Sequence, residues 1–526
     1  MRPVRAMGTK VALVSFTPMY GRPSPRSVDN NDRKNEIKYL FLLNMSIYII
    51  IVIIIFLVIY YNKRNKIEID AIEYVRDGCY PIIGNLFSLI KNRTKFLKNS
   101  REIYGDCFKV KLLNQTIIFI LSPFDWMNVI KNQSFQFMGE QFSKTAFDLD
   151  HNFFGKSQLD TELQGYFTQY LKCSNGLEKL NITLIEEMFL FIKKEKNDLN
   201  EKQMQWRNIG LFEFCSKFLI NSITKTLFGN VELEFIERNY TNFDSNIQYL
   251  FFLFPNWVYQ LLFRNLLKSR CYLNKYWLNS IHEYNESDLI RDRTNLMMKN
   301  SDWFSSKDYA GEKTFLLWAS LTNTIPTLFW SLLYILKDEF IFEKVFNEIN
   351  EHFPKEFFNN IQHSSINDNI LHDKLICCIY LESIINESLR LYSNPMIMRQ
   401  STEDFEFTLH DTRKIFIKKN SIVALYPNIA QNDSNYFTSP NKFIFDRFIN
   451  KTGENSHGFL PFGSGKSMCP GKLFAKSIIK LSIIIFLQFI HYKLNHLENK
   501  IPNEKTHRYG LGVSHPEKDI PILLKF

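Results

Sequence analysis

One cysteine of this chain lies in a setting that suits metal binding through sulfur. Phe462, Gly465, Cys469 and Gly471 follow one another at short intervals, and a long apolar run begins directly after them. A cysteine binds metal as a thiolate, which the free N–H groups at the start of a helix stabilise. The two glycines lack a Cβ and let the backbone approach a flat ring, against which Phe462 can pack. The spacing predicts Cys469 as the axial ligand of a haem iron, a ligation that activates dioxygen.

Two further charged motifs bear on this interpretation, because a lone cysteine is most often only a buried thiol. Glu387 and Arg390 stand three apart on one helix face, which on its own is usually a weak surface ion pair. Arg447 follows within the aromatic residues 443–448. Together with the cysteine loop, these motifs resemble the cytochrome P-450 superfamily over about residues 70 to 526. The resemblance implies a haem cofactor and a buried structural ion triad of Glu387, Arg390 and Arg447, whose disruption would cost several kcal/mol.

Residues 316–326 carry a narrower resemblance, to the central helix of the sterol and oxysterol 7-alpha-hydroxylases, a group related to prostacyclin synthase and sterol 12-alpha-hydroxylase. It implies that Trp318 and Ala319 line the substrate pocket. Most of the superfamily has an acid followed by a threonine in this helix, whereas here Thr322 and Asn323 occupy those places. The change matters because splitting dioxygen consumes protons and an amide does not titrate.

The proton path is therefore expected to use water held by Asn323 or the hydroxyls of Thr322 and Thr324. Pro326 adds a second constraint, because it lacks an N–H and leaves the carbonyl of Thr322 without its usual helical donor. The resulting kink predicts an opened groove at Thr322 and Asn323, with room for oxygen and water. The alternative is a proline that a buried helix tolerates without any function.

Three functions are compatible with these motifs. The first, favoured by Trp318 and Pro326, is a monooxygenase that hydroxylates a sterol or oxysterol. The resemblance implies attack near ring position seven, with dioxygen and with electrons from NADPH through a flavoprotein reductase. The second is a haem-thiolate lipid-peroxide isomerase of the prostacyclin-synthase type, which needs neither electrons nor dioxygen and also has asparagine at the place of Asn323. The third is a haem-binding protein without catalysis.

Haem carboxylates call for a cationic partner in the protein. Ser467 stands two residues before the cysteine, where the superfamily usually has arginine or histidine, and residues 160–180 show no clear Trp-x-x-x-Arg pattern. Arg399 matches a propionate-binding arginine of the superfamily, and a guanidinium pairs well with a carboxylate. The alternative for Arg399 is an exposed strand residue.

The rest of the chain predicts one large catalytic domain. No repeat or Gly/Ser-rich linker divides residues 70–526, so residues 62–526 are expected to form one haem-thiolate catalytic domain. The resemblance implies a cytochrome P-450 fold that is mainly helical with a small β-sheet region. That region should include a hairpin with strands at 107–112 and 116–121. The eight cysteines form no Cys-x-x-Cys pair, which argues against a zinc site or a disulfide framework and for a reducing compartment.

The N-terminal part is expected to hold two segments of different character. The apolar run within residues 38–61 is long enough to span a bilayer and predicts a transmembrane anchor. Lys63 and Arg64 follow it and favour a cytosolic domain on the endoplasmic reticulum membrane. Residues 1–37 are expected to form a disordered extension. Their arginines resemble a mitochondrial transit peptide, which leaves the mitochondrion as the alternative location.

A basic face next to the cysteine predicts a protein partner. Lys472, Lys476 and Lys480 are spaced by four, so they share one face of the helix after Cys469, and Lys466 lies in the adjoining loop. Such a patch would attract an acidic flavoprotein reductase by electrostatic steering. The alternative is a solvated lysine face without a partner.

An aromatic segment predicts contact with a membrane. Phe254 and Trp257 lie among apolar residues flanked by arginines, a composition that suits a membrane interface and a lid for lipid entry. The alternative is a buried pair of core helices. The partners expected from the sequence are therefore a reductase, a lipid or sterol substrate and a membrane, and no nucleic acid.

Overall fold

The structure is a computed structural model that describes residues 72–526, apart from 81–82, 114, 152, 154–156, 201–205, 253–255, 280–284, 361–369, 450–456, 466–467, 495–499, 506–509 and 511. The expected extension (1–37) and anchor (38–61) lie outside the described residues. The chain divides into two compact units, Met1–Glu68 and Ile69–Phe526, and the second unit contains every element described below.

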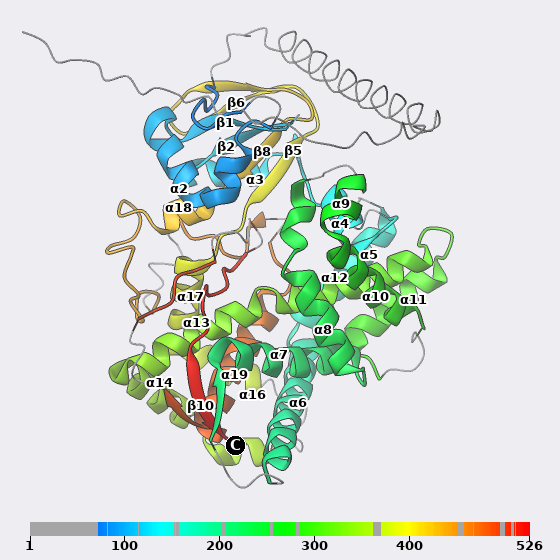
Figure 1. Ribbon diagram of the computed structural model, residues 1–526, viewed down its shortest axis with the longest axis vertical. Helices are drawn as coiled ribbons and strands as arrows, with labels where there is room; N and C mark the ends of the chain where they lie inside the picture. Colours follow the sequence, from blue (N-terminus) through cyan, green and yellow to red (C-terminus); the bar gives the residue numbers. More distant parts are fainter. Residues whose placement is uncertain are drawn as a thin grey trace, which may run out of the picture. The chain divides into compact units, whose positions relative to one another are not determined.

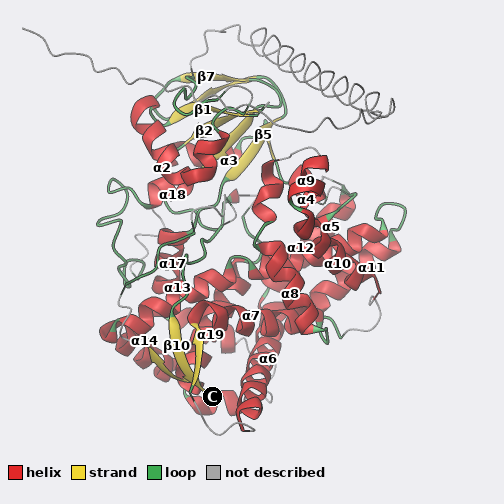
Figure 2. Cartoon of the chain, viewed as in Figure 1, coloured by secondary structure: helices red, strands yellow, loops and turns green. Residues whose placement is uncertain are grey.

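Helices make up most of this unit, as Figures 1 and 2 show. They are α2 (Leu86–Tyr104), α3 (Pro123–Lys131), α4 (Glu140–Phe147), α5 (Gln158–Leu171), α6 (Ser174–Asn200), α7 (Leu211–Phe228), α8 (Leu233–Asp244), the 3-10 helix η1 (Ile247–Phe252), α9 (Asn256–Leu262), α10 (Arg264–Asn279), α11 (Asp288–Lys299), α12 (Ser306–Leu321), α13 (Thr324–Lys337), α14 (Glu339–His352), α15 (Lys355–Asn360), α16 (Ile370–Cys377), α17 (Ile379–Tyr392), α18 (Pro427–Gln431) and α19 (Lys472–Phe489).

The strands are short and form three small sheets. They are β1 (Cys107–Leu112), β2 (Gln115–Ile120), β3 (Phe135–Phe137), β4 (Arg207–Gly210), β5 (Ile397–Ser401), β6 (Phe405–Thr408), β7 (Lys414–Ile417), β8 (Ile422–Leu425), β9 (His491–Leu494) and β10 (Pro521–Lys525). The prediction of a mainly helical fold with a small β-sheet region is confirmed.

The largest sheet has the strand order β1-β2-β8-β5-β3, and β2 and β8 are its parallel pair. In Figure 1 this sheet lies with α2, α3 and α18 at the top of the view, above most of the helices. The predicted hairpin is formed by β1 and β2, with Cys107 opposite Ile120 and Leu112 opposite Gln115. Its second strand begins one residue earlier than predicted. β4, β10 and β9 form a second sheet, and β6 and β7 pair as a ribbon.

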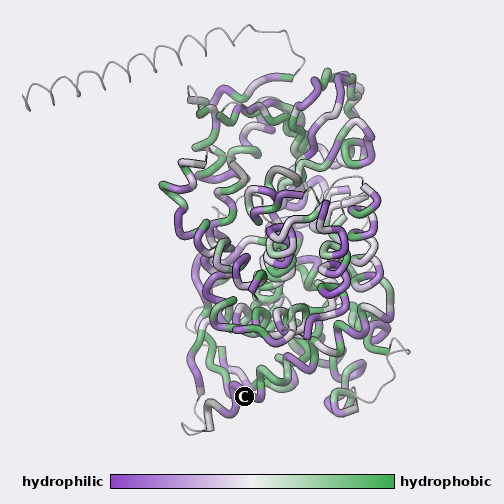
Figure 3. Tube along the Cα trace, turned by 90° about the vertical axis from the view of Figure 1, so that its right-hand side faces the viewer, coloured by the Kyte–Doolittle hydropathy of each residue, from purple (hydrophilic) through white to green (hydrophobic). Residues whose placement is uncertain are grey.

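The helical part packs around α13 and α19, which are apolar on almost every side. A helix that is apolar all round is buried rather than amphipathic. α13 contacts α7, α14, α17 and α19, so it lies in the centre of the packing. Most helices farther from this centre are amphipathic, and Figure 3 shows apolar and polar stretches alternating along them. The residues Ser306–Lys337 are long and apolar enough to cross a bilayer, but 72% of their most apolar window is buried inside the domain.

The central helix begins at a defined residue and is interrupted in its middle. At the start of α12, Ser305 and Asp308 form a capping box, which satisfies two N–H groups that would otherwise lack a partner. α12 ends at Leu321 and α13 begins at Thr324, with Thr322 and Asn323 between them.

Candidate active site

The loop before α19 folds back on itself and presents Cys469. The backbone N–H of Cys469 donates to the carbonyl of Phe462 at 2.8 Å, and the N–H of Met468 donates to the carbonyl of Gly465 at 3.1 Å. Gly463 and Gly465 have φ angles of +68° and +60°, in the left-handed region that favours glycine. Gly465 is thus in a tight turn, as predicted, whereas Gly471 has a φ of −85°, which any residue adopts. The turn holds the cysteine just before a helix.

Burial and two nearby groups act on the pKa of the Cys469 thiol in opposite directions. The residue is open to solvent at its surface, yet the protein around the sulfur is dense enough to raise the pKa of the thiol by burial. The backbone N–H of Gly471 and the charge of Lys172 act to lower this pKa without overcoming the burial. A coordinated metal cation deprotonates a thiol outright, so the sulfur can serve as a ligand despite the raised pKa. Sequence reasoning missed Lys172, because it reaches the loop from the end of α5.

The structure brings the three predicted triad residues together. Arg390 donates to both oxygens of Glu387, through Nε at 2.7 Å and through Nη2 at 2.9 Å. Arg447 donates through Nε to Oε2 of Glu387 at 3.0 Å. Glu387 and Arg390 are fully buried, and the Arg447 side chain is 10% exposed. Two guanidinium groups on one buried carboxylate satisfy its charge and most of its lone pairs.

Arg390 also ties α17 to the segment that leads toward the cysteine loop. Its Nη1 donates to the carbonyls of Gln431 at 2.7 Å and Pro440 at 2.8 Å. Glu387 in turn accepts the backbone N–H of Ile444 at 3.0 Å. These bonds satisfy backbone groups in an irregular segment that forms no helix or sheet hydrogen bonds there. The triad therefore fixes the conformation of the segment between α18 and the cysteine loop.

Arg399 lies on β5 and is only 3% exposed, which excludes the alternative of a surface strand residue. Its Nη1 donates to the carbonyl of Met398 at 3.0 Å, and its guanidinium lies 5.6 Å from the ring centre of Phe137. Burial lowers the pKa of Arg399, and no acidic side chain among the described residues pairs with it. A buried cation without a counter-ion is costly, so this position is suited to an anionic group from outside the chain.

The interruption of the central helix falls at Thr322 and Asn323, where the opened groove was predicted. Pro326 lies in the first turn of α13, where a missing N–H leaves no helical bond unmade. Thr322 and Asn323 keep right-handed helical φ/ψ angles, so the chain passes from α12 to α13 through a local break in the hydrogen-bond ladder rather than through a change of conformation. A break of this kind is what a proline kink produces. Thr324 donates its hydroxyl to the carbonyl of Ser320 at 2.7 Å and so helps to bridge the interruption.

The side chains at the interruption reach two distant segments. Thr322 Oγ1 donates to Oδ1 of Asp244 at 2.7 Å. The side-chain oxygen of Asn323 accepts the N–H of Val513 at 2.9 Å. Gly512 makes this approach possible, because a Cβ there would lie 2.0 Å from the Asn323 oxygen. Sequence reasoning missed Asp244 and Val513, and nothing in their local sequence marks them as neighbours of the central helix.

The two residues predicted to line a substrate pocket differ in their surroundings. Ala319 is exposed although its helix is part of the core, so a small molecule could reach this face. Trp318 is partly buried, packs near the rings of Phe142 and Phe147, and donates its indole N–H to Asp244 at 3.0 Å.

The prediction of an exposed basic face on α19 is wrong. Lys476 and Lys480 are 8% and 5% exposed, and both form ion pairs with Glu382. Burial raises the pKa of Glu382, but Lys480 and Lys476 outweigh it and lower the pKa to about 2. The spacing by four does place the lysines on one face, but that face packs against α17 and α16. Lys472 is half-buried, and Lys466 lies outside the described residues.

The aromatic segment is divided between exposed and buried side chains. Trp257, Leu261 and Leu262 on α9 are 68%, 71% and 66% exposed, whereas Tyr259 is 3% exposed. The buried-core alternative therefore holds for one face of α9 only. Phe254 lies outside the described residues.

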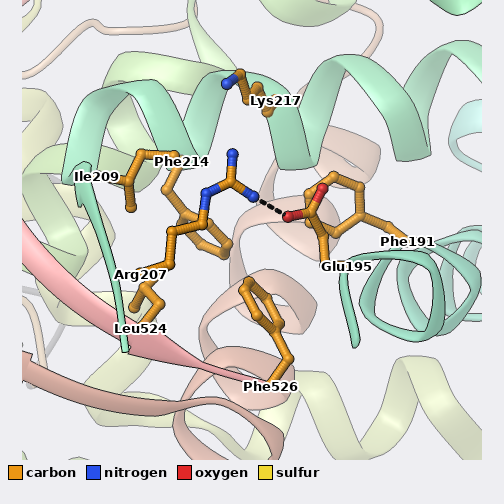
Figure 4. A pocket seen from close by; sticks show the side chains of 8 residues that line it. All are labelled: Phe191, Glu195, Arg207, Ile209, Phe214, Lys217, Leu524 and Phe526. Atoms are coloured by element: carbon orange, nitrogen blue, oxygen red, sulfur yellow. Dashed lines mark hydrogen bonds and ion pairs between the residues drawn. The ribbon is translucent and has the colours of Figure 1, made fainter. Parts of the chain in front are cut away.

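A small pocket elsewhere is no candidate for the site. It holds about 230 Å³, partly open to solvent, whereas pockets for small molecules are ~300–1,000 Å³. Figure 4 shows its lining, in which Arg207 pairs with Glu195 beside Phe191, Phe214 and Phe526. It contains none of the residues named above. No group of three or more His, Cys, Asp or Glu that could hold a bare metal ion occurs in the part of the chain that the structure describes.

Comparison with known proteins gives a consistent result. The family model described as "Cytochrome P450" matches residues 77–523. Cytochrome P450 7B1 of Mus musculus is 28% identical over 85% of this chain and 89% of its own length. The 7-alpha-hydroxycholest-4-en-3-one 12-alpha-hydroxylase of Homo sapiens is 26% identical over 84% and 91%. Cholesterol 7-alpha-monooxygenase of Cricetulus griseus is 28% identical over 89% and 95%.

Proposed function

The chain belongs to the cytochrome P450 family, and on that premise we propose that it is a monooxygenase that hydroxylates a sterol or an oxysterol. The observation that carries the sterol assignment is the similarity, over more than four fifths of the chain, to two relatives named as a sterol 12-alpha-hydroxylase and a cholesterol 7-alpha-monooxygenase. Attack near ring position seven, with electrons from NADPH through a flavoprotein reductase, is part of this proposal. The resemblance of residues 316–326 to the central helix of the 7-alpha-hydroxylases supports it.

The cofactor of this family is haem with a cysteine thiolate, and the residues present fit it. Cys469 is the proposed axial ligand, held before α19 by the turn at Gly465. Arg399 is the proposed partner of a haem propionate, because it is a buried guanidinium without an acidic partner among the described residues. When bound, a haem with this ligation supplies dioxygen activation. Phe462 and Gly471 complete the proposed cofactor loop.

We assign a structural role to Glu387, Arg390 and Arg447. The triad holds the segment between α18 and the cysteine loop by bonds to its backbone. None of its members needs to contact a substrate for this role. Trp318 and Ala319 are the proposed pocket residues on the central helix.

Membrane association is proposed from two features. Trp257, Leu261 and Leu262 form an apolar face on α9 that is exposed to solvent. Exposed apolar side chains on a short helix suit the headgroup boundary of a bilayer. Together with the apolar run in residues 38–61, this face supports a location on the endoplasmic reticulum membrane, with the mitochondrion as the alternative.

The proposal is tested by titrating the purified ferric protein with cholesterol and with side-chain oxysterols. A sterol that displaces iron-bound water is expected to shift the visible absorption of the haem in a saturable way. Absence of a shift with every sterol tested would contradict the sterol assignment. Rearrangement of a lipid peroxide without NADPH would instead identify the isomerase that the asparagine at position 323 also permits.

A further inference from the structure

The interruption of the central helix carries no ionisable side chain of its own. Thr322, Asn323 and Thr324 offer hydroxyl and amide groups, which hydrogen-bond but do not titrate at ordinary pH. A monooxygenase places one atom of dioxygen in the product and the other in water, which consumes two electrons and two protons whatever the electron donor. Protons must therefore reach this interruption from another part of the fold.

A carboxylate from another helix binds directly to the interruption. Asp244, the last residue of α8, accepts the hydroxyl of Thr322 at 2.7 Å and the indole N–H of Trp318 at 3.0 Å, both on Oδ1. Of the three polar residues at the interruption, Thr324 donates to its own helix and Asn323 accepts from Val513. Thr322 thus links this group to a titratable side chain.

The surroundings of Asp244 make a charged carboxylate energetically unfavourable at this position. The residue is 5% exposed, and it lies at the C-terminal end of a helix, where the dipole disfavours negative charge. Phe147 and Trp318 contribute aromatic rings to the same region. An amide at position 244 could accept the same two hydrogen bonds without this cost, so packing alone does not require an acid.

His515 brings a second titratable group to Asp244 from the C-terminal segment. Its Nε2 lies 3.9 Å from Oδ2 of Asp244, the oxygen opposite the one that Thr322 and Trp318 share. This separation is too long for a hydrogen bond but short enough for an ion pair when the ring is protonated. The His515 side chain is 16% exposed, whereas Thr322 is 1% exposed. His515, Asp244 and Thr322 therefore form a chain of contacts from a partly exposed imidazole to the buried interruption.

We propose that Asp244 is a positioning residue for proton delivery in this monooxygenase, supplying from α8 the carboxylate that the central helix lacks and acting through the hydroxyl of Thr322. The hydroxyl oxygen accepts a proton from the protonated carboxyl while the original hydroxyl proton leaves on the other side. One proton enters and one leaves, and Thr322 is unchanged. This inference rests on the monooxygenase activity and is independent of which sterol is the substrate.

The test compares Asp244→Asn with Thr322→Val in the reconstituted full-length enzyme. Both variants keep the shape of the side chain and remove the proton path. Coupling, the fraction of consumed NADPH that appears as hydroxylated product, is expected to fall by roughly tenfold or more in each variant, with hydrogen peroxide formed instead. The double variant should be no worse than either single variant, because both changes remove the same path.

Two further variants separate the proposal from a general loss of structure. Thr322→Ser keeps a hydroxyl and is expected to restore most of the coupling that Thr322→Val loses. Glu234→Gln changes an exposed acid on the same helix and is expected to leave coupling unchanged. The spectral titration with sterol and the midpoint of thermal unfolding are measured for every variant as readouts that do not depend on turnover.

Three outcomes would overturn the proposal. Wild-type coupling in Asp244→Asn would show that no proton path uses this carboxylate. A weaker sterol titration with unchanged coupling of the bound enzyme would make Asp244 a substrate-binding residue. Loss of folding in Asp244→Asn, together with normal coupling in a folded Thr322→Val, would make its role structural.

Discussion

Two carboxylates of α17, the fully buried Glu387 and the partly exposed Glu382, differ in how their charge is compensated. Glu387 has two arginines and a backbone N–H as partners, whereas Glu382 has two lysines that reach it from the next core helix. In both places one carboxylate faces two cations. Removing such an acid leaves buried positive charge without compensation, which costs more than the pair itself contributes.

Glu387→Gln is expected to destabilise the domain by ~3–5 kcal/mol, because Arg390 and Arg447 would lose their counter-ion. Chemical unfolding of the purified protein, followed by haem absorption and by circular dichroism, measures this change. Glu343→Gln alters an exposed acid on α14 and should stay within ~0.5 kcal/mol of wild type. Equal stability of the Glu387 and Glu343 variants would contradict the structural role assigned to the triad.

Glu382 predicts a pH dependence of stability with a definite sign. Its folded pKa is about 2, below the ordinary 4.5, so the stabilisation is present above pH ~4.5 and is lost as the pH falls toward 2. The shift corresponds to at most ~3 kcal/mol. Unfolding free energies measured across this window should fall less steeply in Glu382→Gln than in wild type. Parallel curves for the two proteins would exclude Glu382 as a source of the acid sensitivity.

The substitution Arg399→Leu distinguishes the destabilising effect of a buried charge from its proposed role in binding haem. Without the guanidinium, the protein stripped of haem should be as stable as wild type or more so, because an uncompensated charge has gone. The holoprotein should release haem faster, by roughly tenfold for each 1.4 kcal/mol of lost pairing. Transfer of haem to an acceptor protein measures the rate. The exposed Arg413→Leu serves as control, and equal release rates in both variants would refute the propionate assignment.

At the scale of elements, α9 presents an apolar face without a described partner. Replacing Trp257 and Leu261 by serine should weaken the binding of an anchor-deleted domain to lipid vesicles by roughly a hundredfold or more, since each large apolar side chain contributes ~1.5–3 kcal/mol when buried. Cosedimentation with vesicles measures the binding. Trp303→Ser removes a tryptophan that is 60% exposed outside α9 and should have no effect. Equal binding of the wild type, the α9 variant and the Trp303 variant would indicate that this face of α9 does not contact the membrane.

Single elements also show what local sequence can and cannot predict. The hairpin of β1 and β2 was predicted to within one residue, because strand alternation and turn residues are local signals. For α19 the periodicity correctly placed Lys476 and Lys480 on one face, but it could not tell that α17 packs there. A helical repeat defines faces, whereas the neighbour of each face depends on distant segments.

For the whole molecule, the family could be predicted from motifs spread over the chain. The residues of the proposed proton path could not be predicted in this way. The cysteine loop, the Glu387 pair and Arg447 each carry a spacing that is readable in one segment. Thr322 and Asp244 are 78 residues apart, and Asn323 and Val513 are 190 residues apart. Such contacts form only when the helices pack together, so no local sequence pattern predicts them.

Turnover in isotopically labelled dioxygen distinguishes a haem-thiolate monooxygenase acting on a sterol from the alternatives. The full chain, with a flavoprotein reductase, NADPH and the sterol that gives the strongest ferric titration, is analysed by mass spectrometry of the product. The expected product is a sterol that has gained one labelled oxygen atom, with consumption of NADPH. A product that carries no label, or a rearranged product formed without NADPH, would contradict monooxygenase activity on a sterol.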